Sequence, residues 1–267
     1  MRKYYYALGL GIQETMAYRA DFWLGIVSAV FPIAIQVFMW QALYQGVEGS
    51  HLYGRTHAQM LAYAVSASLL WRLLKTGFEY EINDDIKNGG LSKYVIRPIA
   101  YPSYRLSCFL GQKAAVLLSG IALIAVALLC VGLYFQASPV SLPRAVLFVP
   151  ILIGALVLNF FIFFCVGMWA FWLSEIGFIF EAVRIVIVVL SGGIFPLEIF
   201  GDAVCRVLKL LPFNYAVGFP VDVLVGTASR SAILTGIMLQ LFWIGMMILI
   251  SHGLWNLGKK KYLAAGG

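Results

Sequence analysis

The stretch EYEINDDIKNGGLSKYVIRPIAYP, residues 79–102, is the longest clearly polar run in a chain that is otherwise mostly apolar. Acidic residues open it and basic residues follow, an order that complements the dipole of a helix. Gly89 and Gly90 then provide a helix stop, and Pro98 and Pro102 prevent an easy continuation. We therefore predict a short amphipathic helix of about ten residues that faces water between two apolar segments.

Two interpretations of this stretch stay open. It is either an ordinary solvated loop or a docking element for a soluble partner. Its acidic residues Glu79, Glu81, Asp84 and Asp85 also fit, in principle, a metal site or acid–base chemistry. No histidine accompanies them, and a basic stretch follows, so a solvated helix face is the favoured interpretation of the acids.

The composition indicates a membrane protein. Of the 267 residues, 62% are hydrophobic and only 12% are charged. Apolar runs of about twenty residues recur, which is the length that crosses a bilayer as a helix. We expect an all-α polytopic membrane protein in the inner (plasma) membrane, with residues 1–267 forming one membrane domain and no separate soluble domain of enzymatic size.

Charges and motifs exclude several other classes of protein. The net charge is +7, but the basic residues gather beside the ends of apolar segments, which argues against nucleic acid as a partner. The four cysteines form no Cys-x-x-Cys pair, and the three histidines match no zinc spacing. GLWNLGK (253–259) has the spacing of a phosphate-binding loop, but Lys260 stands where Ser or Thr is needed and no strand precedes it. We predict no catalytic residue, cofactor or metal in this chain.

Six segments are long and apolar enough to be predicted membrane spans. The fifth follows a short return at Ser174–Arg184, in which Glu181 and Arg184 are one turn apart and can pair. Asn159 lies within the fourth, where a helix–helix hydrogen bond explains it at least as well as a substrate contact. The spans are expected at Phe22–Tyr44, Ala58–Leu74, Ser107–Tyr134, Val146–Trp172, up to Gly193 for the fifth, and Ala232–Asn256.

Two regions outside the spans have apolar character of a different kind. Residues 1–20 show apolar side chains at helical spacing and are predicted to form a surface helix, or else the first turns of a tilted first span. Residues 194–228 are too broken by glycine and proline for one span and too apolar for an exposed loop. We expect short re-entrant or interfacial helices there.

The basic residues give an orientation. With six spans and both termini in the cytoplasm, 14 of the 19 Lys and Arg residues lie on the cytoplasmic side. The polar stretch between the second and third spans, residues 76–105, is then cytoplasmic. The five basic residues on the outer side are Arg55, Arg144, Arg206, Lys209 and Arg230.

This pattern resembles the permease subunit of an ABC type-2 exporter over essentially the whole chain. The similarity rests on the order of a surface helix, six spans, a cytoplasmic helix after span two and broken helices between spans five and six. Its loose motifs are DIKNGGLSKYVIRPIAYPSYRLS (85–107), SGGIFPLEIF (191–200) and LKLLPFNYAVGFP (208–220).

The resemblance implies a transport mechanism with a separate energy source. A cytoplasmic ATPase subunit would bind ATP and Mg, and a second permease, identical or a sibling, would complete the translocation path within the lipid bilayer. The residues implied for ATPase coupling are Glu79, Glu81, Asp84, Asp85, Lys87, Gly89, Gly90 and Leu91. Secondary contacts would come from Glu175, Glu181 and Arg184, and the outer gate from Gly192, Gly193, Pro196 and Pro212.

Two other classes remain as alternatives. A secondary transporter or channel would work without an ATPase and would need a coupling group within the membrane. A membrane assembly scaffold or a membrane-embedded enzyme is the third class, and an enzyme would show polar residues clustered at one depth.

Overall fold

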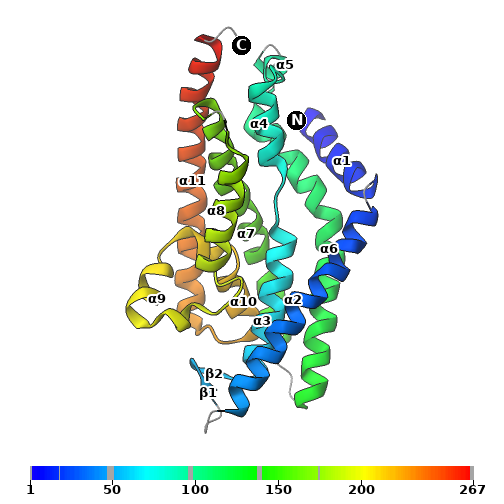
Figure 1. Ribbon diagram of the computed structural model, residues 1–267, viewed down its shortest axis with the longest axis vertical. Helices are drawn as coiled ribbons and strands as arrows, with labels where there is room; N and C mark the ends of the chain where they lie inside the picture. The colour runs from blue at the N-terminus through cyan, green and yellow to red at the C-terminus, as the bar shows by residue number, and fades with distance from the viewer. Residues whose placement is uncertain are drawn as a thin grey trace.

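The computed structural model describes residues 2–17, 19–46, 51–95, 99–136, 140–173 and 175–264. Long helices run along the long axis of the molecule (Figure 1). In chain order the helices include α1 (Arg2–Ala17), α2 (Arg19–Gln45), α3 (His57–Leu74), α4 (Phe78–Lys87), α5 (Ser92–Val95), α6 (Tyr101–Phe135), α7 (Leu142–Met168), α8 (Gly177–Leu190) and α11 (Arg230–Ala264).

Within the described parts, two helical segments are long and apolar enough to cross a membrane. They are Leu142–Phe171, which joins α7 to the short 3-10 helix η1 (Trp169–Phe171), and Arg230–Tyr262 in α11. A third candidate arises if the two halves of α6, Tyr101–Ala114 and Ser119–Phe135, count as one bent span. Helices also occupy the other ranges where spans were expected, but the number of six spans stays a prediction.

The fifth segment differs from the expectation. Residues Ser174–Arg184 were expected to form a short return before the span, whereas α8 already begins at Gly177. Glu181 and Arg184 therefore lie inside α8, and their predicted pair is confirmed at 2.7 Å. The helix has 14 residues, so it is about 21 Å long at 1.5 Å per residue.

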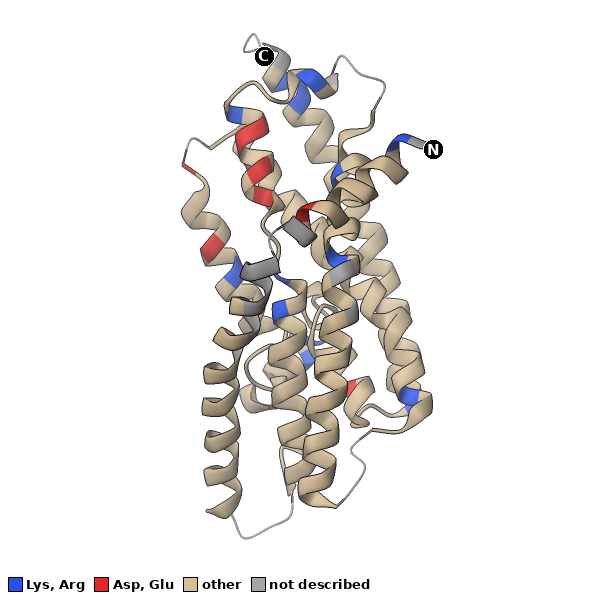
Figure 2. Cartoon of the chain, turned by 90° about the vertical axis from the view of Figure 1, so that its right-hand side faces the viewer, with Lys and Arg blue, Asp and Glu red and all other residues tan. Residues whose placement is uncertain are grey.

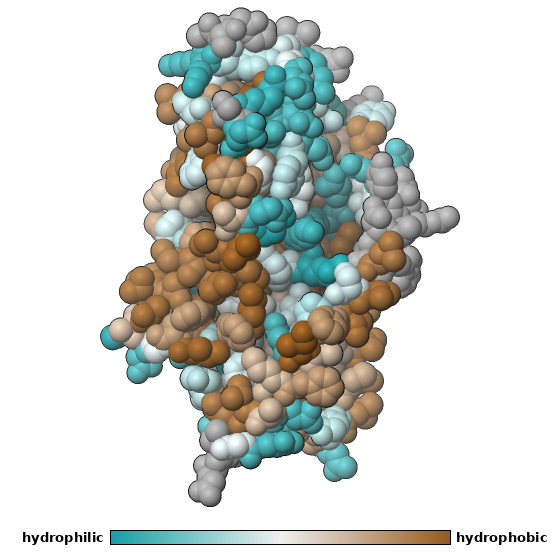
Figure 3. Space-filling model, viewed as in Figure 1, coloured by the Kyte–Doolittle hydropathy of each residue, from teal (hydrophilic) through white to brown (hydrophobic). Residues whose placement is uncertain are grey.

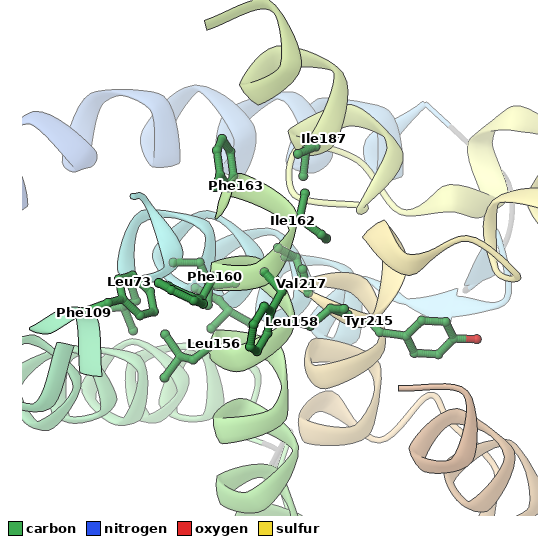
Figure 4. Packing of buried hydrophobic residues seen from close by; sticks show 14 of the residues in the cluster. Leu73, Phe109, Leu156, Leu158, Phe160, Ile162, Phe163, Ile187, Tyr215 and Val217 are labelled. Carbon is green, nitrogen blue, oxygen red and sulfur yellow. The ribbon is translucent and has the colours of Figure 1, made fainter. Parts of the chain in front are cut away.

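Helix α7 lies at the centre of the packing and contacts α4, α10 and α11, while α6 packs against α1 and α3. Aromatic rings fill the core where these helices meet. Phe160 of α7 lies beside Phe109 of α6 and Leu73 of α3 (Figure 4). Asn159, next to it, donates from Nδ2 to the carbonyl oxygen of Leu74 at 2.7 Å, which confirms the helix–helix interpretation of this residue.

Helix α1 is a separate helix that lies against α6 (Figure 1). The two backbones approach closely because glycines face each other across the contact. A Cβ at Gly11 would be 2.2 Å from the carbonyl oxygen of Cys108, and one at Gly111 would be 2.1 Å from that of Leu8. Helices α1 and α2 run at an angle to each other (Figure 1), and the placement of α1 on the membrane surface stays a prediction.

A two-stranded β-hairpin is a small exception in this mostly helical fold, and the sequence did not predict it. Strands β1 (His51–Leu52) and β2 (Arg55–Thr56) pair antiparallel in the loop before α3. Tyr53 and Gly54 connect them with φ values of 52° and 74°, the left-handed geometry of a two-residue type I′ turn. Thr56 then caps α3 through a reciprocal capping box with Gln59. The hairpin lies at the opposite end of the molecule from α4 and α5 (Figure 1).

The segment between α8 and α11 consists of short pieces, and the prediction of short helices there is confirmed. Glycines with positive φ at positions 192, 201 and 226 separate or end these pieces. The segment folds back against the lower half of α11 and α7 (Figure 1). Its elements are η2 (Leu197–Phe200), α9 (Asp202–Leu208), η3 (Pro212–Tyr215) and α10 (Gly218–Val225).

Charged residues are distributed unevenly along the molecule. Most of them gather at the end that carries α4 and both ends of the chain, and the long helical shafts below are nearly free of them (Figure 2). After the predicted orientation, we call the end with α1, α4, α5 and the C-terminal turns of α11 the inner end. The end with the hairpin and the broken segment is called the outer end.

Candidate functional site

Helix α4 presents one buried and one exposed face at the inner end. Phe78, Ile82 and Ile86 recur at helical spacing, and this stripe is buried. Acidic side chains lie in the first turn and Lys87 in the last, as the sequence predicts, so the charges complement the helix dipole. The opposite face exposes Tyr80, Glu81, Asp84 and Lys87 to the surroundings.

The apolar face of α4 is seated on the end of α7. The ring of Phe78 stacks on Phe160 with centroids 4.8 Å apart and meets Phe109 edge-on at 5.4 Å. Ile82 lies over Gly167, where a Cβ would be only 3.3 Å from the Ile82 Cδ1. Aromatic pairs of this geometry contribute about 0.5–1.5 kcal/mol each beyond the area that they bury.

Arg184 ties α4 to α8. Its guanidinium donates to Glu79, which has no exposed surface, and to Glu181 at 2.7 Å. Glu79 also accepts from the Thr76 hydroxyl at 3.2 Å. Burial raises the pKa of Glu79, and its ion pair with Arg184 opposes this rise without cancelling it. Tyr80 completes the contact by donating to Glu181 at 2.7 Å.

Arg105 ties α4 to α6 in the same way. Its guanidinium donates to both Glu81 and Asp85. The Tyr101 hydroxyl donates to the same Asp85 at 2.8 Å, and Lys93 lies 3.4 Å from it. Asp85 is buried, and Arg105 and Lys93 balance its negative charge within the chain.

The turn after α4 depends on two glycines. Gly89 has φ of 73°, which confirms the predicted left-handed stop. A Cβ at Gly90 would be 2.7 Å from the Asp85 Oδ1. The backbone N–H of Leu91 donates to the Asp85 carbonyl oxygen at 2.7 Å, and the Leu91 side chain is fully buried. Ser92 then hydrogen-bonds Tyr262 of α11 at 2.9 Å.

The structure thus divides the residues expected at a coupling surface. Glu81, Asp84, Lys87 and Gly89 are exposed, whereas Glu79, Asp85 and Leu91 are buried and Gly90 is half-buried. The expectation of a solvated acidic face is wrong for Glu79 and Asp85, because each meets an arginine from a distant helix. Among the expected secondary residues, Glu175 is exposed, and Glu181 and Arg184 contact α4 within the chain.

The residues expected at an outer gate belong to the turn after α8 and to the broken segment that follows it. The carbonyl oxygen of Gly192 accepts from the Tyr63 hydroxyl of α3 at 2.8 Å. Gly193, Pro196 and Pro212 are buried. The N–H of Gly218 donates to the Ser191 carbonyl oxygen at 2.7 Å, so the turn after α8 is closed onto the start of α10.

Arg55 of the hairpin is the central residue of the outer end, and sequence analysis placed it only in an outer loop. Its side chain is 3% exposed and pairs with Asp222 of α10 at 2.7 Å and Glu198 of η2 at 3.0 Å. It lies 4.4 Å from the centre of the Tyr63 ring. Burial disfavours the charged guanidinium, but Asp222 and Glu198 outweigh it and raise the pKa of Arg55. The hairpin is thereby fixed to both halves of the broken segment.

A cavity of about 600 Å³ opens beside this ionic cluster. Arg55, Glu198 and Asp222 line it, together with apolar residues such as Phe219 and Leu239. Its charged groups already pair with one another, since Lys209 lies 2.8 Å from Glu198. Across the parts of the chain that the structure describes, no group of three or more His, Cys, Asp or Glu side chains is arranged to hold a metal ion.

Comparison with known proteins places this chain in a family. A family model described as "ABC-2 family transporter protein" matches residues 30–266, which is most of the chain. No curated protein matches the chain.

Proposed function

The chain belongs to the ABC-2 family of transporter membrane proteins, and on this premise we propose that it is the permease subunit of an ATP-driven exporter. A separate cytoplasmic subunit would bind and hydrolyse ATP with Mg. A second permease, identical or a sibling, would complete the translocation path, and six spans would cross the bilayer with both termini in the cytoplasm. In support of this orientation, α1, α4 and the end of α11 lie at one end of the molecule (Figure 1).

The observation that carries the proposal is the construction of α4. Its exposed face offers Glu81, Asp84 and Lys87, while its other face is held by arginines from α6 and α8. A partner that moves this exposed face would therefore move two membrane helices with it. We assign α4 and its glycine turn to the ATPase contact, with Asp84 and Lys87 as the polar side chains that the partner meets.

The outer end supports the same proposal. The broken segment and the hairpin are joined by Arg55 and by the Tyr63 hydroxyl, so they form one unit at the end opposite α4. In the proposed exporter this unit closes the outer end of the path, and Gly192, Gly193, Pro196 and Pro212 form the turns on which it bends.

Affinity purification of the tagged chain from mild detergent tests the proposal. We expect an ATP-hydrolysing subunit to co-purify with the parent chain and to be lost from the double variant Asp84→Lys with Lys87→Glu. This variant changes only exposed side chains of α4, and Arg230→Glu on the outer side is its matched control.

Purification of the parent chain alone, without ATPase activity, would contradict the exporter proposal. A secondary transporter, channel or scaffold would then be the better account. If the ATP-hydrolysing subunit still co-purifies with the double variant, the chain has an ATPase partner, but the contact with it does not lie on the exposed face of α4.

A further inference from the structure

The chain leaves helical geometry between α3 and α4, at residues 75–77. This junction lies directly below α4 (Figure 1), where the hydrophilic surface of the inner end is bordered by hydrophobic surface (Figure 3). The last carbonyl groups of a helix have no partner within that helix, and a buried carbonyl group without a partner is costly. The hydrogen bonds of the junction therefore have to come from other parts of the chain.

Three successive carbonyl groups at the junction each accept a hydrogen bond from a side chain of a different helix. These carbonyl groups belong to Leu74, Lys75 and Thr76. Asn159 of α7 donates to the first at 2.7 Å, Lys113 of α6 to the second at 2.6 Å and Arg184 of α8 to the third at 3.4 Å. The position of the junction is thus linked to three long helices at once.

The donor side chains are turned inward, unlike cations that anchor the end of a span in water. Asn159 is 1% exposed and Lys113 is 9% exposed. The Lys113 ammonium also lies 5.7 Å from the centre of the Phe109 ring, which belongs to the core under α4. Buried hydrogen bonds of this kind do not exchange readily with water, so a displacement of the carbonyl groups acts on the donors themselves.

Polar atoms without a partner surround the same junction. Within the described part of the chain, Asn159 Oδ1, Glu79 Oε2 and Arg184 Nε are buried and make no hydrogen bond. Such atoms are uncommon in folded proteins. Glu79 and Arg184 already form an ion pair through their other atoms, so one contact holds both a free acceptor and a free donor. A small shift of α4 against α8 can bring these two atoms together, which suits the junction to a second arrangement.

We propose that the three carbonyl groups of residues 74–76 form the joint through which α4 moves the membrane helices, with Lys113, Asn159 and Arg184 as its positioning residues. A partner that displaces α4 displaces these carbonyl groups, and the buried donors carry the movement to α6, α7 and α8. This inference rests on the proposed function and names the residues that act behind the ATPase contact.

Hydrogen–deuterium exchange of the complete complex, with and without ATP, tests the inference. The complex consists of the full-length chain and the ATPase subunit that co-purifies with it. Mass spectrometry follows peptides of α4, of α8 and of the broken segment between α8 and α11. Asn159→Leu and Lys113→Met each remove a donor and keep the approximate size of the side chain, while Lys113→Arg keeps a cationic donor. Gln36→Leu is the matched control, because it removes an amide that bonds Ser68 of α3 away from the junction.

In the parent complex we expect ATP to change the exchange of α4 and also that of α8 and the broken segment. In Asn159→Leu and Lys113→Met the ATPase subunit should still co-purify and α4 should still respond to ATP. The response of α8 and the broken segment should be lost in these two variants and kept in Lys113→Arg and Gln36→Leu. A chain that is merely less stable exchanges faster under both conditions, so the difference made by ATP separates positioning from stability.

Full responses in both donor-removing variants would overturn the inference, and so would an equal loss in Gln36→Leu. Loss of the ATPase subunit from Asn159→Leu and Lys113→Met would also overturn it, because the joint lies behind the contact. A parent complex in which ATP changes the exchange of α4 alone would overturn it without any variant, and the proposed function would stand. A parent chain that co-purifies with no ATPase subunit would overturn the proposed function and this inference with it.

Discussion

The inner and outer ends of this permease use arginine in opposite ways. At the inner end, two arginines from two helices hold the acids of one short helix, α4. At the outer end, a single arginine, Arg55, holds carboxylates from two different segments. The inner arginines also bind acids near water, since Glu81 is 47% and Glu181 is 55% exposed. The partners of Arg55, at 26% and 18%, are more enclosed.

This difference predicts different consequences of losing a charge. Replacing either Arg105 or Arg184 at the inner end leaves the other arginine to hold α4. Water can also reach part of the carboxylate charge that loses its partner. An outer variant releases the hairpin, η2 and α10 together and leaves Asp222 without its cation, while Glu198 keeps Lys209. The outer end should therefore be the less tolerant of the two, although the inner end makes the proposed contact with the ATPase.

The largest effect is expected from Arg55→Met. Removing one partner from a buried ion pair costs about 3–5 kcal/mol of unfolding free energy, because the remaining charge stays buried without compensation. Chemical denaturation of the purified chain in detergent measures this loss. Arg230→Met removes an exposed outer arginine and should change the unfolding free energy by less than about 0.5 kcal/mol. An Arg55→Met variant as stable as this control would refute the role of Arg55 as the outer tie.

A smaller and pH-dependent effect is expected at Glu79 and Arg184. Burial raises the pKa of Glu79 above its ordinary value of 4.5, so the folded chain holds this proton more tightly than the unfolded chain. The stability that Glu79 contributes is therefore fully present below pH 4.5 and is lost as the pH rises through the raised pKa. Arg184→Gln should increase this loss of unfolding free energy to about 1–3 kcal/mol at neutral pH. At acidic pH, where Glu79 is protonated, the variant should change the stability little.

Denaturation curves of the parent, Arg184→Gln and Glu79→Gln chains between about pH 4 and pH 8 check this prediction. The Glu79→Gln chain lacks the titrating group. Adding Glu79→Gln to both the parent and the Arg184→Gln chain should therefore remove the pH-dependent difference between those two chains. A gap between the parent and Arg184→Gln that is constant over this pH range would show that Arg184 acts on α4 by packing alone.

The smallest effect on stability is expected in the turn after α4. Gly89 has a positive φ, and no atom lies within 4 Å of the place where a Cβ would be. Gly89→Ala should therefore cost only the left-handed strain, about 1–2 kcal/mol, and Gly89→Asn should cost less because asparagine tolerates this geometry. Thermal unfolding of both variants measures the difference. Equal losses for the two would point to a cause other than backbone strain.

Local features of the inner end followed from sequence, while its long-range pairs did not. The short helix at 78–87, the stop at Gly89 and the pair of Glu181 with Arg184 depend on neighbouring residues, and all were predicted correctly. The pairing of Arg184 with Glu79 depends on how α8 packs against α4, and no local pattern encodes it. One signal in the sequence could have indicated that the two acids are buried, because Glu79 and Asp85 flank the apolar stripe of Phe78, Ile82 and Ile86.

The outer end was less accessible to sequence analysis for the same physical reason. Glycine and proline positions between 191 and 228 predicted its short helices, because these residues act on the backbone locally. The hairpin was missed because two-residue strands carry too few side chains to show an alternating pattern. Arg55 meets Asp222 across 167 positions of the chain, and only the packed structure brings them together.

Site-specific photo-crosslinking in cells tests the central claim, that the exposed face of α4 is the contact for an ATP-hydrolysing subunit. A benzophenone side chain would be placed at Asp84 on α4 or at Arg206 on α9, both of which are exposed positions. The account predicts a crosslinked adduct with the ATP-hydrolysing subunit from position 84 and none from position 206. An intact complex that forms the adduct from position 206, or none from position 84, would contradict it.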